Sequence, residues 1–315
     1  MAFQIFIDGK EGTTGLQLFD RMQNRPDLTL LQIDDDKRKD PAERKKLMNA
    51  SDVTFLCLPD EAAIEAAAMI DNPHTKVIDA STAHRLSPGW AYGFPELSPA
   101  FREAIAASPR IANPGCYATG MISIVYPLIR LGLMPTDYPV VCHAISGYSG
   151  GGKKMISAYA NPARTAEYSG VRQYGLSQSH KHQAEMQAIP GLAYTPIFNP
   201  AVADFYCGMT VSVPVYSRLL ARPASAADLH AALAAYYEGQ SFVEVMPFMG
   251  EGVLEGGFLP SNTLVGTNKL QLFVCGNGER TLLAACLDNL GKGASGAALQ
   301  SMNIALGLDE TTGLL

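Results

Sequence analysis

The feature of the sequence that most restricts the fold is its N-terminal stretch, where a short apolar run leads into a glycine-rich turn. The run Phe3–Ile7 predicts a strand. Gly9, Gly12 and Gly15 follow it, and an apolar face at helical spacing begins at Leu16. Glycines in such a unit allow a tight turn and let a pyrophosphate approach the N-terminus of the helix. We therefore predict a nucleotide-binding turn, with an ordinary strand-to-helix connection as the alternative.

Strands and helices alternate after this turn. Apolar runs predict further strands at 29–33, 53–59 and 76–79. A helix is predicted over 61–70, between the last two of them. This alternation implies a parallel, doubly wound sheet with right-handed crossovers. Because such sheets bind ligands at the carboxyl ends of their strands, the polar segment Ala80–Arg85 is expected near a ligand.

Charged residues of both signs follow the second predicted strand, where nucleotide folds contact the adenosine ribose. Three acids, at positions 34–36, precede the bases Lys37, Arg38 and Lys39. An acid there accepts a hydrogen bond from a free ribose 2′-hydroxyl, whereas basic residues receive a 2′-phosphate. Lys37 and Arg38 therefore favour NADP over NAD, with solvated loop charges as the alternative.

The segment 111–120 (IANPGCYATG) joins this half of the chain to a long helical pattern. The pattern starts directly after Gly115, so Cys116 falls in the first turn of a predicted helix, where free N–H groups and the helix dipole favour an anion. A free thiol is only about 3% ionised at pH 7, and a pKa lower by one unit would raise that fraction to roughly a quarter. Cys116 is thus a candidate nucleophile, and a buried structural cysteine is the alternative.

The second half of the chain has a different pattern. It predicts one clear helix at 225–237 and a closing helix rich in small residues from Ala297 to Leu306. Strands are predicted at 139–145, 192–198, 205–215, 241–246 and 270–275. We expect a mixed or antiparallel α+β domain, with one sheet face packed and the other available to a partner subunit. Within it, the glycine-rich loop Ser146–Lys154 suits an anionic substrate group, or is a flexible surface loop.

Two domains are expected, because 315 residues exceed what one core usually holds. The fold class is α/β: a Rossmann-type doubly wound parallel sheet plus an α+β domain with a mixed or antiparallel sheet. We place an NADP-binding domain at 1–116, completed by the C-terminal helix at about 288–315. The catalytic and dimerisation domain then spans 117–287.

Composition excludes several classes of protein. A net charge of −6 argues against a general nucleic-acid binder, which needs a concentrated basic face. The sequence contains no apolar run of membrane-spanning length and no signal-peptide pattern, so we expect a cytoplasmic protein. Six dispersed cysteines without a Cys-x-x-Cys pair indicate reduced thiols, not a disulfide framework or zinc site.

Several motifs, taken together and in order, resemble those of one enzyme family. They are the glycine turn from Gly9 to Gly15, DASTAHR at 79–85, NPGCYATG at 113–120, SHKHQAE at 179–185 and DNLGKGASG at 288–296. The chain resembles the N-acetyl-gamma-glutamyl-phosphate reductases of arginine biosynthesis, in particular their shorter, type 2 subgroup. That family is similar in turn to aspartate-semialdehyde dehydrogenase and, more distantly, to glyceraldehyde-3-phosphate dehydrogenase.

The resemblance implies NADPH-dependent reduction of an acyl phosphate to an aldehyde with loss of phosphate. A Cys116 thiolate would attack the acyl carbon and form a thioester, which is then reduced. We assign the base to His182, with His180 nearby and Glu185 as an orienting or substrate-facing carboxylate. A homo-oligomer, a dimer or tetramer, is expected by the same analogy.

The resemblance and the motifs together define the expected binding residues. Those for NADP are Gly9, Gly12, Thr13, Thr14, Gly15, Lys37, Arg38, Ser81, Thr82 and Asn289. Those for the substrate are Ser149, Gly150 and Arg85, and further candidates for its carboxylate are Arg110, Arg164 and Lys153. No metal is expected, although His180, His182 and Glu185 resemble a short ligand set.

The sequence leaves four questions open. Whether His180 or His182 meets Cys116 depends on whether the segment is helical or extended. His84 either faces the cofactor or belongs to an ordinary loop, while His143 and His230 are expected to be structural. The substrate could be a related acidic acyl phosphate, aspartyl or aminoadipyl phosphate. A thiol hydrolase using the same Cys–His pair, or a nucleotide-binding redox sensor, are the alternatives from other functional classes.

Overall fold

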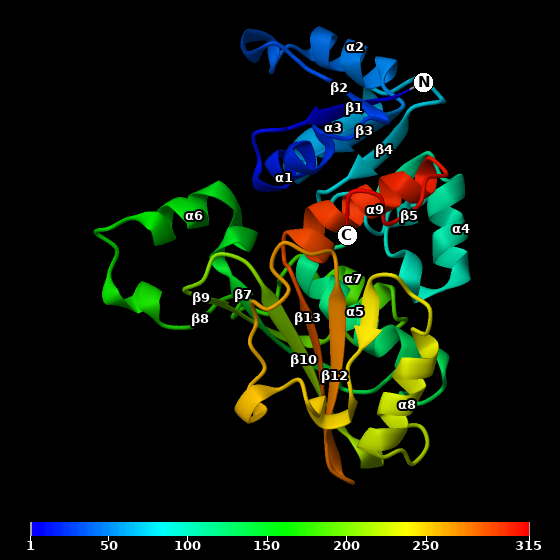
Figure 1. Ribbon diagram of the computed structural model, residues 1–315, viewed down its shortest axis with the longest axis vertical. Helices are drawn as coiled ribbons and strands as arrows, with labels where there is room; N and C mark the ends of the chain where they lie inside the picture. Colours follow the sequence, from blue (N-terminus) through cyan, green and yellow to red (C-terminus); the bar gives the residue numbers. More distant parts are fainter. Residues whose placement is uncertain (1, 315) are drawn as a thin grey trace. The chain divides into compact units, whose positions relative to one another are not determined.

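A computed structural model describes residues 2–314 of the chain, which packs as two compact units (Figure 1). One unit comprises Met1–Pro114 and Ala294–Leu315, and the other comprises Gly115–Gly293. The predicted boundaries, after 116 and before 288, differ from these. The helix that begins at Cys116 packs on the sheet of the second unit, and residues 288–293 bond to loops of that unit.

The first unit contains a six-stranded parallel sheet in the order β2-β1-β3-β4-β6-β5, which confirms the doubly wound prediction. Its strands are β1 (Phe3–Asp8), β2 (Leu28–Leu31), β3 (Val53–Leu56), β4 (Lys76–Asp79), β5 (Ala91–Tyr92) and β6 (Arg110–Ala112). The last two were not predicted as strands, because runs of two or three residues carry no periodicity. Strand β3 is buried along its whole length, as a strand covered on both faces must be.

Helices connect these strands. They are α1 (Thr13–Met22), α2 (Pro41–Ala50), α3 (Asp60–Ala68), α4 (Pro99–Ala107) and the C-terminal α9 (Gly296–Ala305). Helix α9 packs against α4 and β4, and Figure 1 shows it in red beside α4. Its small residues Ala297, Ala298 and Ser301 are fully or almost fully buried, which allows this close packing.

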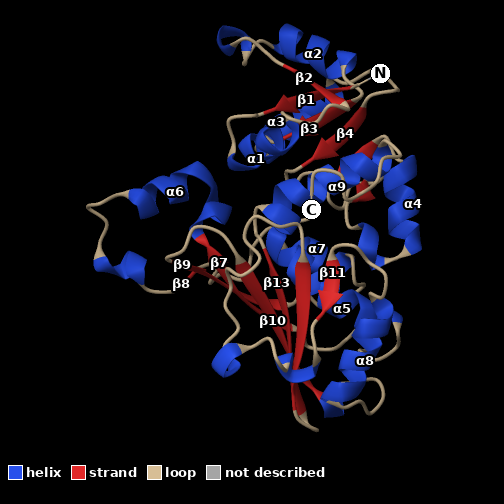
Figure 2. Ribbon diagram, viewed as in Figure 1, coloured by secondary structure: helices blue, strands red, loops and turns tan. Residues whose placement is uncertain are grey.

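The second unit contains a seven-stranded mixed sheet in the order β11-β12-β13-β10-β7-β9-β8 (Figure 2). Its strands are β7 (Val141–Gly147), β8 (Arg172–Gln173), β9 (Ile197–Ala203), β10 (Met209–Tyr216), β11 (Val243–Val245), β12 (Leu270–Gly276) and β13 (Arg280–Leu287). The strand predicted at 192–198 is wrong in position, since β9 begins only at Ile197. The preceding Pro196 has no N–H to contribute to a ladder.

The helices of the second unit are α5 (Cys116–Arg130), α6 (Gly152–Ala160), α7 (Gln183–Ala188) and α8 (Ala226–Tyr236). Helix α5 is buried almost along its whole length and packs so closely on β10 that a Cβ on Gly120 would lie 2.6 Å from Val211. Pro127 lies inside α5 and cannot bond to the carbonyl of Ser123, four residues earlier. The Tyr237 hydroxyl donates to that carbonyl at 2.7 Å, so the helix continues through the proline.

Within residues 2–314, no helix is long and apolar enough to span a membrane.

Candidate functional site

The turn between β1 and α1 brings backbone atoms too close together for side chains. Gly9 has a φ of +84°, and a Cβ there would lie 2.4 Å from the carbonyl oxygen of Cys57. A Cβ on Gly15 would lie 2.5 Å from the Gly9 carbonyl oxygen. Gly12 caps α1 without a side-chain bond, and no acid occupies its first turn, which begins with Thr13 and Thr14. The positive end of the helix therefore carries no built-in anion.

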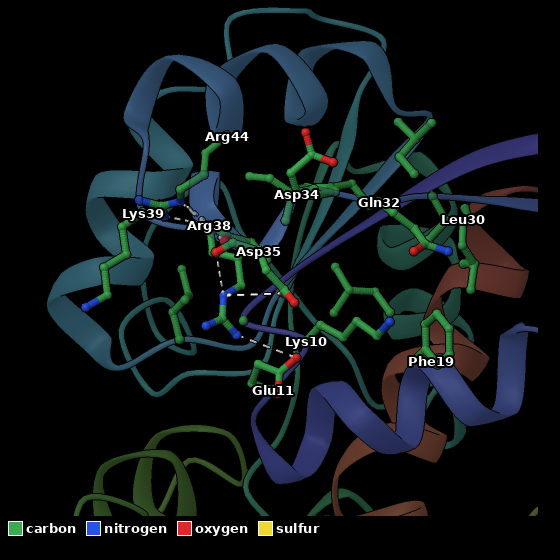
Figure 3. A pocket seen from close by; sticks show the side chains of 18 of the residues that line it. Lys10, Glu11, Phe19, Leu30, Gln32, Asp34, Asp35, Arg38, Lys39 and Arg44 are labelled. Carbon is green, nitrogen blue, oxygen red and sulfur yellow. Dashed lines mark hydrogen bonds and ion pairs between the residues drawn. The ribbon is translucent and has the colours of Figure 1, made fainter.

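A cavity of about 870 Å³ lies beside this turn, in the first unit (Figure 3). Its volume is in the range of small-molecule and cofactor sites. Residues of β1 and of the end of β2 line it together with Phe19 and Leu58. Its charged lining residues are Asp8, Lys10, Glu11, Asp34, Asp35, Arg38, Lys39 and Arg44.

Two arginines of the cavity differ in how they are held. Arg38 is half exposed and lies 3.8 Å from both Glu11 and Asp35. Arg44 is largely buried and pairs with Asp8 at 2.7 Å. Lys37 does not line the cavity, and its Nζ donates to Asp34 at 3.2 Å. The sequence reasoning missed Arg44, which lies on α2, outside the charged loop after β2.

The segment after β4 forms a network around Asp79. The Asp79 carboxylate accepts from the backbone and hydroxyl of Ser81 and lies 2.6 Å from Nδ1 of His84. Thr82 donates its N–H and hydroxyl to Asp60. The His84 ring also stacks on Trp90 at 4.0 Å. The Ser81 and Thr82 hydroxyls therefore donate to protein carboxylates and shape this loop.

Arg85, predicted to bind substrate, is buried in the first unit. Its Nε donates to the carbonyl of Asn113 at 2.9 Å, and the Asn113 amide donates to the Ala294 carbonyl at 3.0 Å. Arg85 thus supports the segment that leads into Pro114 and the start of the second unit.

Cys116 is the first residue of α5, as predicted, and is partly exposed. The helix has no side-chain cap and no acid in its first turn. The N–H of Gly115 donates to Oε2 of Glu185 at 3.2 Å, and Glu185 is almost completely buried. On another side, a Cβ on Gly293 would lie 2.8 Å from the Cβ of Cys116. These contacts fix the position of Cys116 at the helix start.

Two imidazoles contact the residue that follows Cys116. The Tyr117 ring centroid lies 6.0 Å from that of His180 and 5.9 Å from that of His182, and the two imidazoles are 4.8 Å apart. Both histidines lie in a turn that ends where α7 begins, with His182 as N-cap, so the segment is neither strand nor helix. The histidine pair is therefore brought to the start of α5.

A hydrogen bond distinguishes the two imidazoles. The backbone N–H of His182 donates to Nδ1 of His180 at 3.1 Å. Nδ1 of His180 must then be an acceptor, which assigns the proton of the neutral ring to Nε2.

Two phenols complete this cluster. The Tyr174 hydroxyl donates to the Tyr117 hydroxyl at 2.9 Å. Burial raises the pKa of both hydroxyls, that of Tyr117 well above its usual value. Both phenols therefore stay protonated and neutral at physiological pH.

The residues Ser149, Gly150 and Asn289 lie together in the second unit. The Asn289 amide donates to the Ser149 hydroxyl at 2.9 Å and accepts from the N–H of Gly208 at 2.7 Å. A Cβ on Gly150 would lie 3.2 Å from the same amide nitrogen. Asn289, assigned from the sequence to the cofactor, is thus bonded to the residue assigned to the substrate.

The other candidates have separate surroundings. Arg110 donates to three backbone carbonyls, Arg164 pairs with Asp204, and Lys153 is exposed on α6. His143 and His230 bond to Asn199 and to the Met246 carbonyl. Among residues 2–314 no three His, Cys, Asp or Glu side chains are grouped as a metal site.

Burial raises the pKa of the thiols of the other five cysteines. Cys116 differs from them in its position, at the start of a helix. For two of them, Cys207 and Cys286, the pKa rises to about 11. For Cys57, Cys142 and Cys275 it rises for the same reason.

Comparison with known proteins gives matches over nearly the whole chain. Residues 4–107 match a family described as semialdehyde dehydrogenase, NAD binding domain. Residues 116–289 match the semialdehyde dehydrogenase dimerisation domain. The chain is 48% identical to N-acetyl-gamma-glutamyl-phosphate reductase 2 of a Nostoc species, covering 99% of each chain. It is 46% identical to the Pseudomonas putida protein of the same name, covering 98% of each.

Solved structures are similar in fold. Aspartate semialdehyde dehydrogenase II of Vibrio cholerae, complexed with ASA, matches with a TM-score of 0.71 at 17% identity, covering 98% of this chain and 99% of that one. Aspartate semialdehyde dehydrogenase of Francisella tularensis matches with the same TM-score at 14% identity, covering 96% and 99%.

Proposed function

We propose that this chain, which belongs to the N-acetyl-gamma-glutamyl-phosphate reductase family, reduces N-acetyl-gamma-glutamyl phosphate to N-acetylglutamate semialdehyde and phosphate. The reaction uses NADPH and belongs to arginine biosynthesis. The observation that carries the proposal is Cys116 at the acid-free start of α5, with Glu185 bonded to the residue before it and two imidazoles against the residue after it.

The first unit fits a dinucleotide. Its glycine turn leaves no room for side chains where the backbone must approach a pyrophosphate, and the adjacent cavity carries basic side chains. NADPH, when bound, supplies the hydride that reduces the acyl carbon. Thr13 and Thr14 begin the helix whose N-terminus would hold the pyrophosphate, while Ser81 and Thr82 shape the loop after β4.

Cys116 is the proposed nucleophile. Its sulfur attacks the acyl carbon, a C–S bond forms, the bond to phosphate breaks, and a thioester remains on the protein. After the carbonyl carbon is reduced, the C–S bond of the thiohemiacetal breaks and the aldehyde leaves. The positive end of α5 stabilises the thiolate both before it attacks and when the aldehyde leaves.

His182 is the proposed base and acid. It removes the thiol proton before attack and returns a proton to the carbonyl oxygen as the carbon is reduced. His180 holds the backbone of His182 through Nδ1, which supports a positioning role for this imidazole. Glu185 holds the Gly115 N–H and thereby the start of α5, so it orients the nucleophile.

Substrate binding is assigned to Ser149 and Gly150 of the second unit, and Arg85 is given a supporting role in place of contact with the substrate. The bond between Ser149 and Asn289 supports a fixed hydroxyl in that loop, and we therefore group Asn289 with the substrate residues. Arg85 acts through the segment it supports before Cys116.

We further propose a homo-oligomer, a dimer or tetramer, formed through the second unit. The description of the matching family model as a dimerisation domain supports this. The proposed domains follow the two compact units, and the biosynthetic reaction supports a cytoplasmic location.

An assay of the reverse reaction tests the proposal. We expect the purified protein to reduce NADP when N-acetylglutamate semialdehyde and phosphate are both present, and to lose this activity in Cys116→Ser. Aspartate semialdehyde, with its free amine, should react far less efficiently, because a pocket discriminates well on a polar group. No activity in the wild type, or full activity in Cys116→Ser, would refute the assignment.

A further inference from the structure

We propose that the ion pair between Asp8 and Arg44 sets the preference for NADP(H) over NAD(H). Asp8 holds one edge of the Arg44 guanidinium, and another edge binds the 2′-phosphate of the adenosine ribose. This inference rests on the proposed function and names the residues that read the phosphate group.

The pair has the geometry of a positioned cation. Nη2 of Arg44 donates to Oδ2 of Asp8 at 2.7 Å, and Nε lies 3.3 Å from both carboxylate oxygens. The side chains are 14% and 7% exposed. Because a guanidinium is planar, holding its Nε–Nη2 edge also fixes the direction of its remaining N–H groups.

The remaining edge of Arg44 is available to a ligand. Within residues 2–314, Nη1 of Arg44 donates no hydrogen bond, and Arg44 lines the cavity. In Figure 3, Arg38, Lys39 and Arg44 lie on the opposite side of the view from Phe19. Arg38 and Lys39 follow β2, where this fold contacts the ribose 2′ position. Arg44 is therefore grouped with the residues expected at the 2′-phosphate.

The charge of the cavity alone does not select a phosphate. Its lining has four acids and four bases, so it carries no net formal charge that would attract a dianion. Selection then depends on donors that are already oriented. Arg44 is oriented by a buried carboxylate. Arg38 is half exposed, lies 3.8 Å from its acidic neighbours and donates from Nε to the Asp35 backbone carbonyl at 3.2 Å. An arginine fixed in advance loses less side-chain entropy on binding than a mobile one.

The test uses isothermal titration of the full chain with two probes that differ by one group, adenosine 2′,5′-bisphosphate and adenosine 5′-monophosphate. The readout is the dissociation constant of the monophosphate divided by that of the bisphosphate, since a purely structural role would change both constants alike. In Arg44→Leu we expect affinity for the bisphosphate to fall by roughly 10- to 100-fold, the range for a charge-assisted hydrogen bond, with little change for the monophosphate. Thermal melting checks that the variant is folded.

Further variants separate the two residues. Asp8→Asn keeps an acceptor for Arg44 but removes the charge, so it should lower the ratio by a smaller factor than Arg44→Leu. The double variant Asp8→Asn/Arg44→Leu removes the pair without leaving a buried carboxylate beside the phosphate. It should still bind the bisphosphate weakly, because the guanidinium is missing. Lys46→Leu, an exposed change on the same helix that does not line the cavity, should leave the ratio unchanged.

The outcomes distinguish the two proposals. The inference is overturned if Arg44→Leu keeps the wild-type ratio, if the double variant restores it, or if Arg38→Leu lowers it more than Arg44→Leu. If the wild type binds neither probe, nucleotide binding in the proposed function fails as well. If it binds both equally, the 2′-phosphate inference fails, while phosphate-dependent oxidation of the semialdehyde with NAD would still support the reductase chemistry.

Discussion

The charged cavity of the first unit and the Cys116 cluster of the second are built in opposite ways. The cavity lies beside the closely spaced backbone at Gly9 and is lined by charged side chains, several of them paired. The cluster is formed by a helix start and by aromatic and imidazole rings packed around Tyr117. We therefore expect substitutions in the cavity to change nucleotide binding, and substitutions in the cluster to change the covalent chemistry.

The largest difference is expected between the two histidines of the cluster. His182→Ala should lower kcat by roughly 100- to 10,000-fold, the usual loss for a general acid–base residue. His180→Ala should lower it less, because His180 acts through the backbone of His182. Steady-state rates with saturating NADP measure both. A larger loss in His180→Ala would reverse the two roles.

A methyl group beside the nucleophile should also impair the chemistry. Gly293→Ala places a Cβ 2.8 Å from that of Cys116, so the cysteine must move. A displacement of this kind can cost roughly 100-fold in rate. We expect kcat to fall by about 10- to 100-fold, with nucleotide affinity from titration unchanged.

Gly278→Ala is the matched control for that substitution, because nothing lies within 4 Å of the new Cβ. Its kcat should equal that of the wild type. If Gly293→Ala is equally active, Cys116 is not held as the structure indicates.

The corresponding change in the first unit should affect stability and nucleotide binding. Gly9→Ala combines a φ of +84° with a Cβ 2.4 Å from the Cys57 carbonyl oxygen. Gly89→Ala has a similar φ of +82° but open space around the new Cβ. The strained conformation alone costs about 1–2 kcal/mol. In denaturant unfolding, Gly9→Ala should lose more than Gly89→Ala and should also weaken nucleotide binding. Equal losses would show that the close contact does not matter.

The smallest expected effect concerns an ion pair outside both sites. Arg25 lowers the pKa of Asp27 through a side-chain hydrogen bond. Because the folded pKa lies below the unfolded value of about 3.9, the pair stabilises the fold above that value, and the contribution disappears as pH falls through the lowered pKa. The difference in unfolding free energy between wild type and Asp27→Asn should shrink below about pH 4. A difference that grows on acidification would contradict the cause assigned here.

Features encoded locally were predictable from the sequence. Apolar periodicity located the four longer strands of the first sheet, and the glycine spacing located the turn that a side chain would block at Gly9. The break at Pro114 and Gly115 located the start of α5. Each of these depends on neighbouring residues, which a sequence displays directly.

Features that depend on distant residues were not predictable. Glu185 meets Gly115 across 70 positions, and Arg44 meets Asp8 across 36. No local pattern specifies either partner. The strand predicted at 192–198 was misplaced because part of its apolar run, Leu192–Tyr194, precedes Pro196, and the fold begins the ladder after that proline. The division of roles between the histidines depends on one backbone hydrogen bond in a turn.

The central claim, that Cys116 carries the acyl group, is tested most directly by a single-turnover experiment without phosphate. Wild-type protein is mixed with NADP and N-acetylglutamate semialdehyde, and NADPH formation is followed before the protein is digested for mass spectrometry. We predict a burst of about one NADPH per active chain, followed by a stop, with one N-acetylglutamyl group on Cys116 that added phosphate removes. An adduct on another residue, or a burst that persists in Cys116→Ser, would contradict the account.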